Sequence, residues 1–237
     1  VVEKWELFVR RIYDTLDVNI FITGSNAKLL TSEIATSLRG RTISFEVFPF
    51  SFKEYLGYKN IEINLDSSKS LSFIKNALEE YLVNGGFAET IDTEQHLARK
   101  IVSEYLDLIV YKDIADRYRI TNSALLKHLN KYCFTNIATL LSVTKLFNEF
   151  KSQGFQVSKD TLYNYLSYLE NAYALFTVPI YRHSIKEEQR NPKKIYAVDN
   201  SFKKIYDYAM GADISKLYEN IVFLHLRRQT KEIYYFK

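Results

Sequence analysis

FITGSNAKLLTSEIATSLRGRTISFEVFPFS, residues 21–51, is the stretch that decides the fold class. The β-branched, apolar residues 18–22 lead into a Gly24-Ser25-Asn26 turn, residues 27–38 have a helical pattern, and residues 42–48 return to a strand pattern. The first run is too apolar for a half-exposed strand and is typical of a central one. The stretch therefore predicts two strands of one sheet with a helix between them.

Helical patterns flank these two strands. Apolar residues recur at helical spacing over residues 3–16, which predicts an amphipathic helix before the first strand. After the second strand, Pro49 is followed by Ser51-Phe52-Lys53-Glu54, the sequence of a capping box that begins another helix. The order helix–strand–helix–strand indicates an α/β core with parallel strands.

Four polar residues in this stretch are candidates for ligand chemistry. Ser25 and Asn26 come just after a buried strand, which is where open α/β sheets place ligand-binding groups. The alternative is that they only turn the chain and cap the next helix. Arg39 and Arg41 flank a glycine and could offer planar, bidentate donors to a phosphate. The alternative for these two is that they are cations at a helix C-terminus.

A phosphate-binding loop is missing from these 237 residues. Such a loop needs the pattern Gly-x-x-x-x-Gly-Lys-Ser/Thr, so that backbone N–H groups surround the phosphates. None of the seven glycines begins that pattern, and the sequence starts at Val1 rather than methionine. We therefore expect this chain to be an internal fragment that is cut after the nucleotide-binding motifs, and cut again in a strand pattern at residues 233–237.

The chain resembles a prokaryotic AAA+ P-loop ATPase family that carries a C-terminal winged-helix and restriction-endonuclease-like domain of unknown function. The resemblance covers almost the whole chain and rests on four motifs: Thr23-Gly24-Ser25, Arg39-Gly40-Arg41, Phe48-Pro49-Phe50-Ser51-Phe52 and Leu217-Tyr218-Glu219-Asn220. It implies that Asn26 or Ser25 orients the attacking water near the γ-phosphate. Arg41 is the candidate for a role in catalysis and Arg39 for a contact with the nucleotide. ATP and Mg²⁺ are expected in the full-length protein, and none is expected on this fragment.

The expected fold class is mixed α/β and predominantly helical. Four parts are predicted: the C-terminal part of a parallel-sheet AAA+ core (1–60), a helical lid (61–120), a winged-helix domain (121–198) and the truncated start of a nuclease-like α/β domain (199–237). Helical patterns at 71–82, ending at Gly85-Gly86, and at 94–116 support the lid.

The winged-helix prediction rests on three helices followed by a hairpin. Helices are predicted over 123–131, 137–150 and 159–172, and strands over 174–181 and 194–198, with a polar loop at 182–191 between the strands. In such a domain the third helix reads base edges and the basic hairpin contacts phosphates. The candidate nucleic-acid-binding residues are Lys159, Tyr163, Arg182, Lys186 and Arg190.

Acidic residues leave a second interpretation of this module open. Asp160 lies on the third helix, and Glu187 and Glu188 lie in the loop, where they would repel a polyanion. The net charge of +4 permits nucleic-acid binding without requiring it. The module could instead contact a partner protein or a second copy of the chain.

Glu219 is the candidate for nuclease-like chemistry. By resemblance it matches the glutamate that an early helix contributes to Mg²⁺ in restriction-endonuclease-like folds. The alternative is a solvated glutamate on an amphipathic helix, and nuclease activity would rest on fold analogy alone.

Composition bounds the remaining possibilities. The single cysteine, Cys133, excludes an internal disulfide and fits a reducing cytoplasm. Neither a secretory signal nor an apolar run of membrane-spanning length is found in the sequence, so no membrane partner is expected. The four histidines and one cysteine are too widely spaced to form a local metal site.

The sequence thus predicts an AAA+ type ATPase, inactive as this fragment, that works on nucleic acid or a partner protein. The alternative is a non-enzymatic winged-helix DNA-binding or adaptor protein in which the α/β part is only a scaffold.

Overall fold

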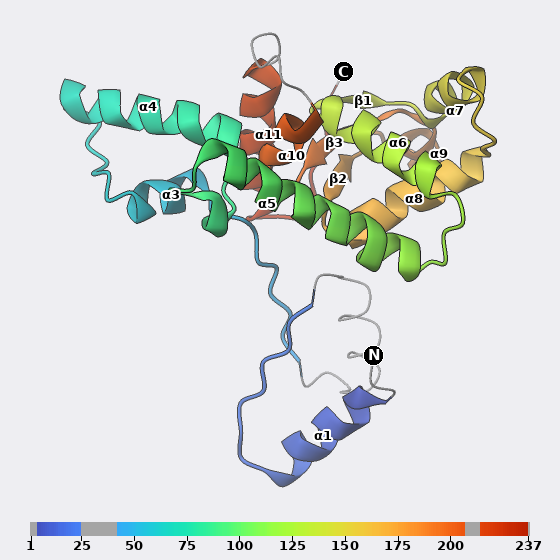
Figure 1. The fold of residues 1–237 in the computed structure, drawn as a ribbon, viewed down its shortest axis with the longest axis horizontal. Coiled ribbons are helices and arrows are strands. Elements are labelled where there is room, and N and C mark those ends of the chain that lie inside the picture. Colours follow the sequence, from blue (N-terminus) through green and yellow to red (C-terminus); the bar gives the residue numbers. More distant parts are fainter. Residues whose placement is uncertain (1–3, 25–41, 207–213, 237) are drawn as a thin grey trace.

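The computed structural model describes residues 4–24, 42–206 and 214–236 (Figure 1). In this part of the chain the fold is mixed α/β and predominantly helical, as predicted. Along the first half the elements are α1 (Trp5–Thr15), α3 (Phe52–Tyr58), α4 (Ser68–Asn84), a 3₁₀ turn (Ala88–Thr90), α5 (Gln95–Leu108) and a π-helix (Ile109–Asp116). The second half contains α6 (Ser123–Thr135), β1 (Thr139–Leu141), α7 (Val143–Ser152), α8 (Lys159–Asn171), β2 (Leu175–Val178), α9 (Ile185–Arg190), β3 (Lys193–Ala197), α10 (Ser201–Tyr206) and α11 (Ile214–Arg227).

The three strands form one antiparallel sheet in the order β1-β3-β2. Ile195 of β3 lies opposite both Thr139 of β1 and Thr177 of β2. A single parallel bridge joins Ile180 to Tyr235, so the residues after α11 run beside the continuation of β2. The strand predicted over 233–236 is therefore reduced to this one bridge.

The two strands predicted at 18–22 and 42–48 are not formed. Residues 17–24 and 42–48 belong to no helix or strand, and Phe21, Ile43 and Val47 are 83–94% exposed. Strands become stable only when their backbone N–H and C=O groups are paired. No described strand runs beside these segments, so the predicted parallel sheet is absent from the described residues, and α1 lies apart from the body with no buried residue (Figure 1).

Several local predictions are confirmed by the helix ends. The capping box is present, because Ser51 Oγ accepts from Glu54 N and the Glu54 carboxylate accepts from Ser51 N. Helix α4 ends at Gly85, whose φ of 77° favours glycine. Ser158 caps α8 through the backbone N–H of Thr161.

The region 137–150 differs from the single helix that was predicted. Ala138 has a φ of 56°, and its N–H donates to Ile195 O at 2.7 Å. Pairing with β3 therefore converts residues 139–141 into β1, and α7 starts only after Ser142. The polar loop 182–191 also differs, since it contains the short helix α9.

One large hydrophobic core joins the sheet to the helices around it, from the end of α4 to α11. Phe134, Phe150 and Phe202 are its largest completely buried side chains. A smaller cluster that includes Tyr55 and Tyr81 lies between α3 and α4.

Candidate functional site

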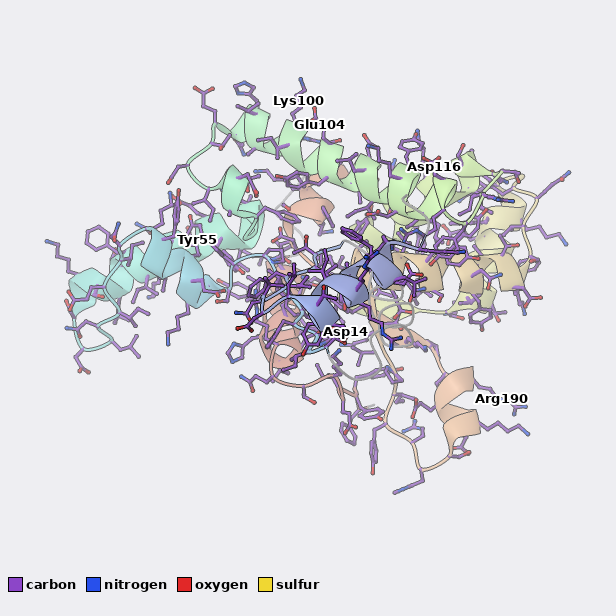
Figure 2. The ribbon with its side chains drawn as sticks, turned by 90° about the horizontal axis from the view of Figure 1, so that it is seen from below. Asp14, Tyr55, Lys100, Glu104, Asp116 and Arg190 are labelled. Atoms are coloured by element: carbon purple, nitrogen blue, oxygen red, sulfur yellow. The ribbon has the colours of Figure 1, made fainter. Side chains whose placement is uncertain are left out.

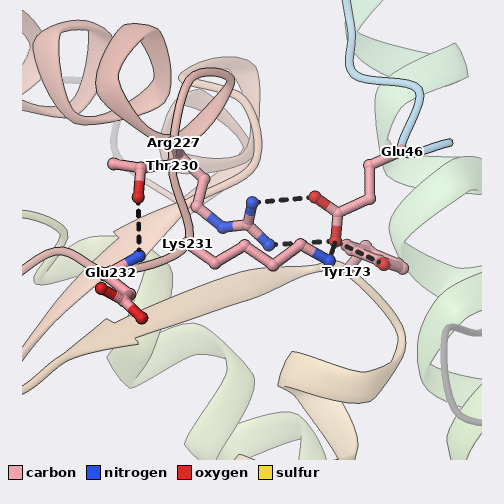
Figure 3. Close-up of polar contacts among 6 residues, drawn as sticks. All are labelled: Glu46, Tyr173, Arg227, Thr230, Lys231 and Glu232. Atoms are coloured by element: carbon pink, nitrogen blue, oxygen red, sulfur yellow. Dashed lines mark hydrogen bonds and ion pairs between the residues drawn. The ribbon is translucent and has the colours of Figure 1, made fainter.

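An extensive polar cluster joins Glu46 to the C-terminal end of α11 (Figure 3). Arg227 makes a bidentate contact with the Glu46 carboxylate, with N–O distances of 2.8 and 3.0 Å. The Tyr173 hydroxyl donates to Glu46 at 2.9 Å, and Lys231 Nζ lies 2.9 Å from the same carboxylate. We call these four residues the Glu46 clamp. The clamp holds together residues 46 and 227, which are about three-quarters of the chain apart in the sequence.

The electrostatics of the clamp favour an ionised Glu46. Burial alone would raise the pKa of this carboxyl, but hydrogen bonds from Arg227, Lys231 and Tyr173 outweigh it and hold the pKa at about 2. The side chains of Glu46 and Arg227 are only 19% and 12% exposed, whereas Lys231 is 72% exposed. Arg227 is therefore the principal partner of Glu46, and Lys231 contacts the carboxylate from the solvent side.

Aromatic rings surround the arginines of this site. The Arg227 guanidinium lies 5.2 Å from the Phe176 ring centre and 5.8 Å from that of Phe48. The Arg228 guanidinium lies 5.1 Å from the centre of the same Phe48 ring. The low polarity of the rings strengthens the charge pair, and cation–π contact adds to it. A cavity of about 180 Å³ lies beside the clamp, lined by residues of β2 and of the chain after α11.

The backbone of Pro49 and Phe50 is fixed by a second set of contacts. Arg228 donates to Pro49 O, and Tyr81 Oη donates to Phe50 O at 2.6 Å. Phe50 N donates to Gly86 O at 2.7 Å. A Cβ on Gly86 would lie 2.2 Å from Phe50 O, so only glycine permits this approach. The segment 46–50 is consequently held by both side chains and backbone.

Gly85 and Gly86 also contact a buried carboxylate. Asp199 follows β3 and is 3% exposed; it accepts from Gly86 N at 2.7 Å and from Ser201 N at 2.8 Å. Burial raises the pKa of Asp199, against the effect of these hydrogen bonds. A Cβ on Gly85 would lie 1.7 Å from Asp199 Oδ1. Gly85 and Gly86, which were predicted to end a helix, therefore also allow the end of α4, the residues after β3 and Phe50 to pack closely together.

Glu219 is engaged with β3. Its Oε1 accepts from Lys194 Nζ at 2.7 Å and from the Tyr196 hydroxyl at 2.8 Å, and it helps burial to raise the pKa of Tyr196. The next residue, Asn220, is completely buried and exchanges hydrogen bonds with both the N–H and the C=O of Ala197. The Leu217–Asn220 motif thus attaches α11 to the sheet. In the described residues no three His, Cys, Asp or Glu side chains gather as a metal ion would require.

The candidate nucleic-acid-binding residues lie on two separate elements. Lys159 and Tyr163 are exposed on consecutive turns of α8, and Lys159 Nζ lies 5.8 Å from the Phe147 ring centre. Arg182 precedes α9, where it donates to Tyr181 O, and Lys186 and Arg190 are exposed on α9 itself. Figure 2 shows α9, marked by Arg190, projecting away from the rest of the molecule.

The candidates for nucleotide chemistry cannot be placed in the same way. Ser25, Asn26, Arg39 and Arg41 all lie outside the described residues. Their roles stay predictions.

Sequence reasoning missed the clamp and Asp199. Glu46 takes a polar position in the alternation of residues 42–48, as Ser44 does, so the pattern gives no signal that its side chain has a partner. Arg227 and Arg228 come at the end of α11, where basic residues are common and carry no specific signal. Nothing local in the sequence pairs Glu46 with Arg227, 181 positions later.

Comparisons with known proteins give two family matches. Residues 75–206, more than half of the chain, match the family described as "Domain of unknown function (DUF8612)", and residues 1–56 match the family described as "AAA domain". None of the described helices has both the length and the apolar character needed to cross a membrane.

Similar proteins occur in both archaea and bacteria. An uncharacterized protein of Methanocaldococcus jannaschii is 36% identical over 234 residues, which are 96% of this chain and 51% of that protein. An uncharacterized protein of Haemophilus influenzae is 33% identical over 228 residues, 96% of this chain and 56% of that protein. The chain thus spans about half the length of the curated relatives it matches. No solved structure matches it.

Proposed function

The chain belongs to the DUF8612 family, and on that basis and the AAA-domain match we propose that it is part of an AAA+ type ATPase that acts on nucleic acid. The observation that carries the proposal is the docking of residues 46–50 on β2 and α11. These residues come near the end of the AAA match, and the Glu46 clamp connects them with Tyr173 in the region of the DUF8612 match and with Arg227 and Lys231 beyond it.

The proposed ATP chemistry rests on residues within the AAA match. Ser25 or Asn26 would orient the attacking water, Arg41 would stabilise charge in the transition state, and Arg39 would contact the nucleotide. ATP would supply the phosphoryl group and Mg²⁺ would neutralise its charge. We expect sequence outside this chain to supply the phosphate loop, since the relatives are about twice as long. The isolated 237-residue chain is then expected to show no ATP hydrolysis.

The order of elements between 123 and 197 supports the winged-helix assignment. Helix α6 is followed by β1, two helices, and then the strands β2 and β3 on either side of α9. Helix α8 would take the place of the DNA-reading helix, and α9 would take that of the wing. Exposed Lys159, Tyr163, Arg182, Lys186 and Arg190 would then face the nucleic acid. The assignment of residues 199–237 to a nuclease-like domain also stays a prediction, as does the nuclease-like role of Glu219, whose carboxylate contacts Lys194 and Tyr196 of β3.

The clamp would transmit the nucleotide state to the nucleic-acid-binding module. The segment 46–50 is joined to the end of α11 by the bidentate Glu46–Arg227 ion pair and by the hydrogen bond from Arg228 to Pro49 O, and it would move together with α11. A rearrangement of residues 1–45 on ATP hydrolysis would therefore displace α11 and, through Asn220, the sheet.

The test is steady-state ATP hydrolysis by the complete protein, with and without DNA. Asn26→Ala should lower kcat while leaving nucleotide affinity nearly unchanged, because a water-orienting group acts mainly in the transition state; removing one such group costs about 2–4 kcal/mol. Arg227→Gln should leave hydrolysis without DNA intact and abolish its stimulation by DNA.

Two results would contradict the proposal. If Asn26→Ala and Ser25→Ala both leave kcat unchanged, the turn has only a structural role. If the complete protein lacks ATPase activity but binds DNA, the non-enzymatic winged-helix protein becomes the correct description.

A further inference from the structure

An exposed group of aromatic side chains includes Tyr181 and His183, which lie just before α9 in the sequence. Tyr181, Tyr234 and Phe236 are 42%, 43% and 78% exposed. The ring centres of Tyr181 and Phe236 are 5.2 Å apart with an interplanar angle of 30°, and Tyr234 meets the Tyr181 ring edge-on at 5.8 Å. His183 also approaches Tyr181 edge-on at 5.8 Å. We call Tyr181, His183, Tyr234 and Phe236 the aromatic patch.

The backbone explains why these rings share one surface. Tyr181 N donates to Tyr235 O at 2.9 Å, and Tyr235 N donates to Pro179 O at 3.0 Å, so the two segments run side by side. Alternation along an extended chain places 234 and 236 on one face. Tyr235 takes the opposite face, where its hydroxyl donates to Pro192 O at 2.6 Å. The patch is thus held in place by backbone pairing rather than by burial of its rings.

Basic residues outnumber acidic ones in the stretch that follows Tyr181. Residues 181–193 contain four basic side chains, at 182, 186, 190 and 193, against the two glutamates 187 and 188. Arg182 directly follows Tyr181, and its charge acts on Tyr235, where it opposes the effect of burial on the pKa of that tyrosine. Exposed rings beside exposed cations match a ligand that presents flat apolar faces along an anionic backbone.

From this arrangement we infer that the aromatic patch and α9 form a binding site for single-stranded nucleic acid, with bases stacked on Phe236 and Tyr181 and phosphates held by Arg182, Lys186 and Arg190. Single strands expose their base faces, and base–aromatic stacking beside basic residues is a common mode of binding them. A duplex hides those faces and would contact only the cations. This inference rests on the proposed nucleic-acid function and specifies its substrate as a single strand.

Fluorescence anisotropy of labelled oligothymidylate and of a duplex of the same length, each mixed with the complete protein, tests the inference. The single strand should bind more tightly than the duplex. Tyr181→Leu keeps an apolar side chain but removes the ring, and it should weaken single-strand binding about fivefold or more while leaving duplex affinity unchanged. Phe236→Leu should act in the same direction, and the high exposure of Phe236 makes misfolding of this variant a poor explanation for weaker binding.

Tyr218→Leu is the matched control. Tyr218 is 41% exposed on α11, so the substitution removes a comparably exposed tyrosine outside the patch and should leave both affinities unchanged.

The possible failures can be told apart. If the duplex binds as tightly as the single strand, or if Tyr181→Leu and Phe236→Leu change nothing, the inference is wrong while the nucleic-acid function stands. If single strands do not bind but duplexes do, the patch is covered by protein in the complete molecule and the inference is equally wrong. If neither binds at any salt concentration, the proposed nucleic-acid function fails as well.

Discussion

Replacing Glu46 with glutamine should release the segment 46–50 from α11 without unfolding the rest of the protein. The substitution keeps the size of the side chain but removes the charge that Arg227 and Lys231 neutralise. Arg227 is only 12% exposed, so it would be left with its charge largely buried and unpaired, which is costly. We therefore expect more frequent opening of the contact between Phe50 and Gly86.

The size of the effect follows from the pKa of Glu46. Without solvent screening, a shift of this pKa from 4.5 to about 2 corresponds to about 3 kcal/mol in the free energy of unfolding. Solvent screens part of this interaction at a partly exposed site, so we expect about 1–2 kcal/mol at neutral pH. Opening of the segment should then become roughly tenfold more frequent.

The pH dependence has a defined sign. Because the pKa of Glu46 is lowered in the folded state, its stabilising contribution is complete above about pH 5 and disappears as the pH falls through about 2. Wild type and Glu46→Gln should therefore differ most at neutral pH and converge in acid.

Hydrogen exchange of the Phe50 amide measures this opening directly, because that N–H donates to Gly86 O. Glu232→Gln is the matched control: it makes the same chemical change at an exposed glutamate on the segment that carries Lys231, and it should change protection little. Equal protection of Phe50 in wild type and Glu46→Gln at neutral pH would refute the reasoning. So would a difference that does not shrink in acid.

Three further outcomes are expected. Gly86→Ala should lower the free energy of unfolding by about 1–3 kcal/mol, because its Cβ would lie 2.2 Å from Phe50 O, whereas Gly57→Ala, with nothing within 4 Å on α3, should be neutral or stabilising in the same thermal melts. Neutralising Arg182, Lys186 and Arg190 together should flatten the slope of log K against log salt for duplex DNA by about 0.9 for each phosphate that the protein no longer neutralises, and an unchanged slope would show that α9 does not face DNA. Cys133, 1% exposed and with its thiol pKa raised by burial, should react with a thiol reagent only in denaturant; rapid reaction in the native protein would contradict its place in the core.

Local signals allowed much of the helical fold to be predicted. The caps at Ser51 and Ser158 and the end of α4 at Gly85 were visible because each depends on residues within a few positions. The boundary at Ala138 was not, since it is set by a hydrogen bond to Ile195 on a distant strand. The strands expected before residue 50 also needed neighbours that the local pattern could not reveal.

The candidate site was less accessible to sequence reasoning. Basic residues in the loop before β3 were recognised because charge is visible in composition. The Glu46 clamp depends on the folded path of the whole chain, which brings position 46 to position 227. Similarly, Tyr181 and Phe236 each look like ordinary strand residues, and only the bridge between 180 and 235 makes them neighbours.

The clamp also fixes an order of events during synthesis of the protein. Glu46 leaves the ribosome 181 residues before Arg227, so at about 5–20 residues per second its partner follows roughly 10–40 s later. Throughout that interval Ile43, Phe45 and Val47, which stay exposed even after docking, belong to a segment with no anchor on α11. The docked arrangement of residues 46–50 can therefore form only after translation has passed α11.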